Sequence, residues 1–410
     1  MNENTELTVV THEVIDRWAT ESDGPVALRL RQKLLPVEES GIVFPPTYAD
    51  IGYNIDTLAD GTRVATIDSV GSQANRMEPL FKSQSSKKED WLVPKIEIVI
   101  RKEPCGECAV CKENAGNRNA RSTACEQPRE VTRSLLDLAH RAADAVVQSS
   151  PSLLSVIEPA FKALQRGDAG PLCSVAPTSL VFGVWDSRGD TGEKRPRLVR
   201  SIIRAWDVEP LHAAAQFNSV WKLLDDAQKE ELKSEAKTKK TDLSEKGLAD
   251  APATFRPKIK LPHYRDGAPN PEARVLGGVL VRGRIERDVT VNLVALRGLR
   301  GSNPSETGNI RKYLLGLSLV AATAEMDLFL REGCLLRYAD DGDAWYAVPR
   351  RGEPKPIKLS AQVAKDYANK AAEPFREKWP TPDQMKHRFD LRAAKKLLAK
   401  KTDDQGATPG

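Results

Sequence analysis

Four of the six cysteines are close together in the sequence, at Cys105, Cys108, Cys111 and Cys125. Thiolates bind zinc, and a C-x2-C turn is the usual way for a short segment to supply two of them. The C-x2-C-x2-C spacing also occurs in iron–sulfur sites, and unligated cytosolic thiols are a third interpretation. Chance clustering at this density is uncommon. The spacing therefore favours a metal site with zinc as first candidate, although no histidine or second C-x2-C pair reinforces it.

A second group of residues could bind an anion. A loop over Asp186–Glu193 contains two glycines together with Arg188 and Thr191, and a run of cations without an acidic residue follows it: Lys194, Arg195, Arg197, Arg200 and Arg204. A flexible loop can turn backbone N–H groups toward a phosphate, and a helix N-terminus favours negative charge. A charge run alone is more often a solvated surface. Here it adjoins a glycine loop and an apolar segment, so the two interpretations carry about equal weight.

A third group lies between Asp68 and Pro79 and is dense in hydrogen-bonding side chains, namely Ser69, Ser72, Gln73, Asn75 and Arg76. One interpretation is a short helix with a good N-cap. The other is a contact to nucleic-acid phosphate or sugar, for which such side chains are commonly used.

Several elements are expected to position these groups. The apolar run Ser179–Trp185 predicts a buried strand, and the spacing from Leu198 to Trp206 predicts a helix with Pro196 in its first turn. Gly278–Leu296 alternates apolar and polar residues and predicts a long strand with one polar face. Asn309–Arg331 predicts a helix buried against that sheet, and Val131–Val147 a further helix.

The domain organisation expected is a main unit over residues 1–350 with two insertions and an extension. The first insertion is the Cys-rich segment at about 101–128, and the second is an excursion at about 240–276 that is rich in proline and charge. Residues 351–410 form a Lys/Pro-rich C-terminal extension whose tail is expected to be disordered.

Composition limits the possible partners. The chain has 410 residues, 40% of them hydrophobic, and a net charge of only +5, so a nucleic-acid surface must come from local clustering. No apolar run approaches the length of a membrane span, and the N-terminal residues lack the order of a secretion signal. A cytoplasmic protein without membrane contact is expected.

Taken together, four motifs resemble a known family. They are GSQANRMEP from Gly71, the segment Ala176–Val208, LSEKGLADAP at 243–252, and GRIERDVTVNLVALRGLRG at 283–301. In this order the set resembles the type I-G (formerly I-U) backbone subunit of CRISPR Cascade complexes, a member of the RAMP superfamily. The resemblance covers roughly residues 45–340 and leaves out the Cys-rich insertion and the segment after about 350.

The resemblance implies an α+β fold with a modified RRM-like (ferredoxin-like) palm, an antiparallel sheet with helices on one face, and inserted finger and thumb segments. Such a subunit binds guide CRISPR RNA through its sugar–phosphate backbone, polymerises along it beside other Cascade subunits, and presents it to target DNA in antiviral defence. Base pairing then carries the specificity. The implied RNA-binding positions are Gln73, Asn75, Arg76, Arg188, Thr191, Lys194, Arg195, Arg197 and Arg200. The excursion at 243–276 is the thumb candidate, and no catalytic residue is implied.

Three other classes stay open. A RAMP-type ribonuclease that processes precursor CRISPR RNA would need a general base such as His212, and a metal nuclease would need carboxylates such as Asp186, Asp190 and Asp207. A scaffold that binds acidic proteins is the third class. Its binding would not show the steep salt dependence of RNA backbone binding. The prediction is a binding protein and not an enzyme.

Overall fold

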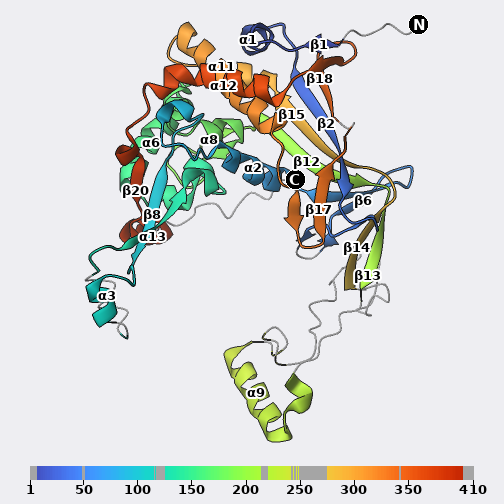
Figure 1. The fold of residues 1–410 in the computed structure, drawn as a ribbon, viewed down its shortest axis with the longest axis vertical. Coiled ribbons are helices and arrows are strands. Elements are labelled where there is room, and N and C mark those ends of the chain that lie inside the picture. The colour runs from blue at the N-terminus through green and yellow to red at the C-terminus, as the bar shows by residue number, and fades with distance from the viewer. Residues whose placement is uncertain are drawn as a thin grey trace.

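The computed structural model describes residues 7–399, apart from 49–50, 115, 117–124, 214–219, 242, 244–245, 247, 249–274 and 341–342 (Figure 1). The fold is mixed α+β, as the sequence predicts. The thumb candidate therefore lies almost entirely outside the described residues, and so do residues 400–410 of the expected tail, whereas its first residues, Lys395–Ala399, are helical.

A ten-stranded sheet forms the centre of the molecule. Its strand order is β1-β19-β18-β2-β15-β12-β7-β6, and β17 also pairs with β2 and carries β16. The three central strands are β2 (Ala27–Pro36), β15 (Ile285–Asn292) and β12 (Val199–Trp206), and they run antiparallel to their neighbours. The others are β1 (Thr8–Val9), β6 (Ile55–Thr57), β7 (Arg63–Asp68), β16 (Phe329–Arg331), β17 (Cys334–Tyr338), β18 (Ala344–Val348) and β19 (Lys355–Lys358).

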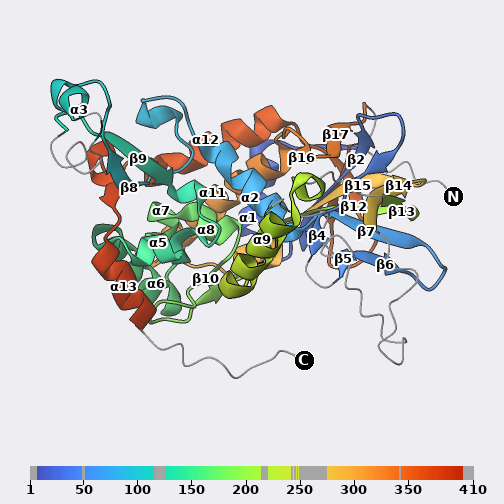
Figure 2. The same ribbon diagram turned by 90° about the horizontal axis from the view of Figure 1, so that it is seen from below.

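Helices cover one face of this sheet (Figures 1 and 2). The longest is α11 (Pro304–Thr323), which is buried over most of its circumference because α12 (Ala361–Arg376) packs on its outer side. The shorter helices α1 (His12–Thr20), α2 (Val70–Met77) and α10 (Leu293–Arg297) complete the layer. Ser69 caps α2 by accepting a hydrogen bond from the Ser72 N–H, as the sequence predicts.

A second, mainly helical part lies beside α11. It contains α5 (Ala145–Gln148), α6 (Pro151–Gln165), α7 (Gly170–Val175) and α8 (Pro177–Val181), and α7 and α8 contact α11. A three-stranded sheet belongs to it, with β8 (Glu97–Glu103) between β9 (Arg129–Ser134) and β20 (Lys386–Arg388). The β8–β9 hairpin carries the Cys-rich segment and α3 (Ala109–Glu113) at its end (Figure 1). A further two-stranded ribbon joins β10 (Val184–Trp185) to β11 (Lys194–Arg195).

The segment after residue 350 is built into both parts. Strand β19 extends the large sheet, α12 packs on α11, and β20 pairs in parallel with β8. Helix α13 (Leu391–Ala399) contacts α5. Three further strands, β3 (Ile42–Val43), β13 (Val208–Ala213) and β14 (Val275–Val281), form a small sheet, and β4 (Thr47–Tyr48) pairs with β5 (Gly52–Tyr53). Helix α9 (Asp226–Lys239) follows β13.

The predicted strand–loop–helix around residue 190 is wrong at both ends. Ser179–Val181 belong to the buried helix α8, and the strand β10 starts only at Val184. The segment from Leu198 is not a helix but leads into β12, a central strand of the large sheet. Its apolar residues fit the helical period of 3.6 as well as the strand period of 2. Val199, Ile203 and Ala205 face the helices, and Ile202 is buried on the other face of the strand. The extra apolar residue at 202 produces the apparent helical spacing.

Three other element predictions need correction. Val131–Val147 is not one helix but strand β9, two 3-10 turns and the short helix α5. The alternating segment Gly278–Leu296 is divided by a turn at 282–284 into β14 and β15, which belong to different sheets, and α10 begins at Leu293. The helix predicted over Asn309–Arg331 ends at Thr323, and its last residues form β16. The sequence also predicts a strand at Arg63–Ile67 and helices at Leu153–Leu164 and Leu359–Ala372, and β7, α6 and α12 confirm these three predictions.

Candidate nucleic-acid interface and metal centre

The sheet face opposite the helices is polar and rich in arginine. Residues of β2 alternate between buried leucines on the helix side and cations on the other side. Neighbours in an antiparallel sheet that are directly opposite point to the same face, so the register gives the rows of this surface. One row is Tyr346–Arg29–Thr290–Arg200, the next contains Arg31–Asp288–Ile202, and the third Lys33–Glu286–Arg204.

Cations outnumber carboxylates on this open face. Its five cations are Arg29, Arg31, Lys33, Arg200 and Arg204, and its carboxylates are Glu286 and Asp288. Glu286 is shared by Arg284 at 2.9 Å and by Arg31 at 3.9 Å. The Arg29 guanidinium stacks over the Tyr346 ring. Within the described chain, the side chains of Arg200 and Arg204 form no hydrogen bond or ion pair, so their charge is available to an external anion.

The β10–β11 ribbon forms the wall of a second basic surface. Gly183 starts it at a φ of +82°, and a Cβ atom there would lie 2.9 Å from Arg197 Cγ, so this position requires glycine. Asp186 is buried in the loop and accepts a hydrogen bond from Thr191 Oγ1 at 2.6 Å. The Thr191 hydroxyl and the Asp186 carboxylate thus hold the loop in shape.

A cleft of about 440 Å³ lies beside this ribbon. Of the predicted RNA-binding positions it brings together Arg188, Lys194, Arg195 and Arg197, whereas Arg200 lies on the open face of the sheet. Arg195 also donates to the Leu164 carbonyl and pairs with Glu193, but the side chains of Arg188 and Arg197 have no hydrogen-bond or ion-pair partner within the described residues. The cleft also contains Arg141, which no sequence motif connects with the loop because it lies more than forty residues away in the chain.

The third predicted group lies on α2, where the fold buries some of its side chains and leaves others exposed. Gln73 is completely buried, where it donates to Asp68 at 2.7 Å and accepts from Ser201 at 2.7 Å. Arg76 bridges the buried Asp68 carboxylate, at 3.1 Å, and the Leu330 carbonyl, at 2.7 Å. Asn75 is exposed. In this structure Gln73 and Arg76 therefore attach α2 to the sheet and to β16, and Asn75 alone of the three is free to contact a ligand through an exposed side chain.

Gln73 belongs to a buried polar network centred on Arg287. The Arg287 side chain is fully buried in β15. It donates to Gln73, Ser201 and Gln32, to the carbonyls of Ala321 and Ala322, and to the sulfur of Met77. Burial lowers the pKa of Arg287. The network connects α2, three strands of the sheet and the end of α11. No sequence pattern indicated it, because Arg287 sits where the alternation predicts an apolar residue.

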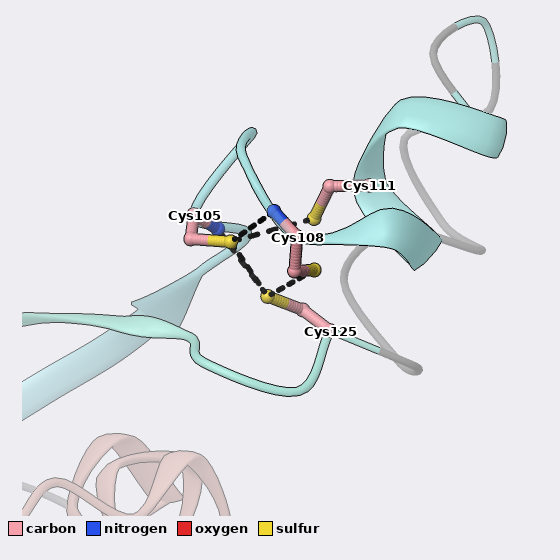
Figure 3. Close-up of side chains that lie close together, drawn as sticks. All are labelled: Cys105, Cys108, Cys111 and Cys125. Atoms are coloured by element: carbon pink, nitrogen blue, oxygen red, sulfur yellow. Dashed lines mark hydrogen bonds between the residues drawn. The ribbon is translucent and has the colours of Figure 1, made fainter.

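The four clustered cysteines converge at the end of the β8–β9 hairpin, where their side chains point toward one another (Figure 3). Their sulfur atoms all lie within 4.8 Å of one another. Three separations are 3.9 Å (Cys105–Cys111), 3.8 Å (Cys108–Cys125) and 3.5 Å (Cys105–Cys125). Four ligands at 2.3 Å from one tetrahedral ion would be about 3.8 Å apart. Backbone N–H groups of Glu126 and Cys111 lower the pKa of Cys108 to about 6, which favours its thiolate, whereas burial raises the pKa of Cys111 to about 12. The site can bind a metal.

The described chain thus combines an α+β core, an open basic sheet face, a basic cleft and a four-cysteine knuckle. Residues 28–210, a little under half of the chain, match the family described as CRISPR-associated protein GSU0053. The match extends from β2 to β13 and includes α2, the four cysteines and the β10–β11 ribbon. It supports a CRISPR-associated protein. No curated protein matches the sequence. Among the described helices, none is both long and apolar enough to cross a membrane.

Proposed function

We propose that this chain is a backbone subunit of a type I CRISPR effector complex, and that it binds guide RNA along its sugar–phosphate backbone. The open sheet face carries the proposal. Arg29 and Arg200 are two strands apart in one row, a distance of about 10 Å, and Arg200 and Arg204 are about 13 Å apart along β12. Cations spread over such distances can contact several phosphates of one strand, which positions an RNA without selecting its sequence.

Topology supports the RRM-like part of the proposal. The strands β18-β2-β15-β12 are adjacent and antiparallel. In chain order the segment between β2 and β12 contains α2, the segment between β12 and β15 contains β13, α9 and β14, and the segment between β15 and β18 contains α11. Strand, helix, strand, strand, helix, strand is the ferredoxin-like order. Both helices pack on the same face, and no helix of the described chain packs on the other face. In the proposed palm, this open face would bind the RNA.

We propose zinc as the metal of the cysteine site. The sulfur separations match a single tetrahedral ion, whereas the ligands of an iron–sulfur cluster bind different iron atoms and must be farther apart. Bound zinc would close the end of the β8–β9 hairpin as a structural crosslink. Cys105, Cys108, Cys111 and Cys125 are its four ligands, which leaves no position open for catalysis.

Salt-dependent RNA binding tests the proposal. Fluorescence anisotropy with a labelled single-stranded RNA should show an affinity that falls steeply with salt, because bound phosphates release counterions. The double variant Arg200→Ala/Arg204→Ala should bind more weakly, and its log–log salt slope should be shallower by about 1.4, because two phosphate contacts contribute about 0.7 each. An RNA of unrelated sequence should behave in the same way.

The matched control is Lys365→Ala/Arg392→Ala. It removes the same charge from exposed positions of α12 and α13, which belong neither to the open face nor to the cleft. Equal salt slopes for the two double variants would refute the proposed surface. Assembly is a separate readout, since electron microscopy should show filaments whose length follows that of the RNA.

Binding without cleavage is also part of the proposal. Precursor RNA incubated with the purified protein should stay intact with and without divalent metal. Cleavage that disappears in His212→Ala would instead identify the ribonuclease class, whose general base would abstract a proton near the RNA.

A further inference from the structure

The cleft beside the β10–β11 ribbon contains a buried arginine with unused hydrogen-bonding capacity. Arg141 is only 4% exposed. Its Nη1 donates to the Gly183 carbonyl at 3.3 Å, and its Nε lies 2.7 Å from the Glu78 carboxylate. Among the described residues its Nη2 and Nε have no hydrogen-bond acceptor, and the neighbouring Glu78 Oε1 has no donor. A buried guanidinium N–H without an acceptor costs free energy. Such a donor beside a cleft therefore indicates that an external anion supplies the acceptor.

The backbone at Arg141 is strained in addition. Its φ of 54° is in the left-handed region, which a non-glycine residue adopts at a cost of about 1 kcal/mol or more. The side chain packs over the Phe182 ring, with its guanidinium carbon 5.4 Å from the ring centroid. Packing by Phe182 and pairing with Glu78 hold the arginine at this position despite the strain.

The remaining walls of the cleft suit a nucleotide. Arg188 and Arg197 lie around it without protein partners among the described residues, so its charge is strongly positive. Trp185 also lines the cleft and is 56% exposed, which is unusual for so large an apolar side chain. Lys194 lies over its ring, 5.4 Å from the centroid. Exposed indole beside arginines is the combination that proteins use to stack a base and bind its phosphate.

We propose that this cleft is a nucleotide subsite, in which Arg141 and Arg197 bind one RNA phosphate and Trp185 stacks against the adjoining base. The inference rests on the proposed RNA-binding function and adds a specific site to it. Arg141 is the buried ligand that fixes the phosphate, and Arg197 and Arg188 lie at the more exposed positions. The cleft volume of about 440 Å³ has room for one nucleotide and little more.

Two variants separate phosphate binding from stacking. Arg197→Ala should make the log–log salt slope of RNA binding shallower by about 0.7, because it removes one phosphate contact. Trp185→Leu should weaken RNA binding about tenfold with the salt slope unchanged, because stacking releases no counterion. If both variants bind RNA as the parent does, the inference is overturned, while binding that depends on Arg200 and Arg204 would leave the proposed function standing.

Arg141 is tested together with its partner, because Arg141→Met alone would bury the Glu78 carboxylate without a counter-charge. The pair Glu78→Gln/Arg141→Met is compared with Glu78→Gln. We expect the double variant to melt within a few degrees of the single one and to bind RNA about tenfold more weakly. Equal affinity of the two proteins would overturn the role of Arg141. If the double variant does not fold, Glu78→Gln/Arg141→Lys replaces it, because lysine keeps the charge and loses the fork of donors.

Titration with a mononucleotide tests the subsite without long RNA. Titration with adenosine monophosphate should quench tryptophan fluorescence to saturation in the parent protein, and the quench should be lost in Trp185→Leu. A parent protein that fails to bind long RNA but gives this quench would overturn the proposed backbone function and support the subsite. Unchanged fluorescence at millimolar nucleotide would overturn the subsite.

Discussion

Replacing Arg287 with methionine should destabilise the protein strongly, because a buried network depends on its guanidinium. Methionine has a similar length and fits an apolar surrounding, so the change removes the donors and leaves little empty space. The acceptors that would lose a partner are the side chain of Gln32 and the carbonyls of Ala321 and Ala322, whereas Gln73 keeps the hydroxyl of Ser201.

The magnitude follows from these acceptors. Arg287 Nη1 donates to Gln32 at 2.6 Å and to Ala322 at 3.3 Å, and these two contacts carry most of the loss. A buried acceptor left without a donor costs about 1–3 kcal/mol. Burial disfavours the charged form of Arg287, so removing this cation from the interior offsets part of the free-energy cost of the unpaired acceptors. We therefore expect the free energy of unfolding to fall by about 2–4 kcal/mol.

Urea unfolding monitored by circular dichroism measures this loss. The matched control is Arg282→Met, the same substitution in the turn between β14 and β15, where Arg282 pairs with Glu209 in an exposed position. An exposed ion pair contributes less than about 1 kcal/mol, so the control should unfold near the parent midpoint. A loss of stability in Arg287→Met no greater than in the control would show that the network does not hold α2, the sheet and α11 together.

Two further predictions concern single sites. Burial raises the pKa of Glu78 to about 7 from an unfolded value near 4.5, so the native state holds the proton over a window in which the unfolded state has released it. Stability should therefore fall as pH rises from about 4.5 to 7, by an amount on the order of 3 kcal/mol, and be flat above it. Glu78→Gln should remove this part of the pH dependence in urea titrations at several pH values, and identical profiles for both proteins would contradict the shift. For the metal, elemental analysis of protein purified without added metal should give about one zinc per chain and no iron. Cys111→Ser or chelation should expose the β8–β9 hairpin to proteolysis without lowering the melting temperature of the sheet, and iron in place of zinc would refute the assignment.

The sequence predicted which side chains cluster or lie on the surface better than it predicted the helices and strands that carry them. The four cysteines converge as their spacing indicates, because a C-x2-C turn needs only local geometry. The basic run beyond Lys194 is on the surface as predicted, but on a ribbon and a strand. Apolar residues at 199, 202, 203 and 206 fit a helix as well as a strand that carries apolar residues on both faces. Only pairing with β15 and β7, far away in sequence, decides between them.

Burial of polar residues could not be predicted for the same reason. Gln73 and Arg76 belong to a helix whose surface and buried sides look alike in sequence, since both carry polar groups. The partners that bury Gln73 are Ser201 and Arg287, which lie 128 and 214 residues away. Long-range contacts of this kind produce no periodic pattern in the sequence, because a single polar residue at a core position only interrupts the hydrophobic pattern.

Two buried arginines differ in how far the fold satisfies their hydrogen-bond donors, and this difference distinguishes a structural role from a binding role. Each nitrogen of the Arg287 guanidinium has an acceptor within the fold, so this charge is already used. Arg141 is almost as deeply buried, yet its Nη2 and Nε have no hydrogen-bond acceptor within the described chain, although Nε lies close to the Glu78 carboxylate, and its backbone is strained. A fold gains nothing from such a group unless something outside it supplies the acceptor. In the proposed RNA complex, Arg141 would therefore make the specific contact in the cleft, and the arginines of the open sheet face would supply attraction that is general to any phosphate chain.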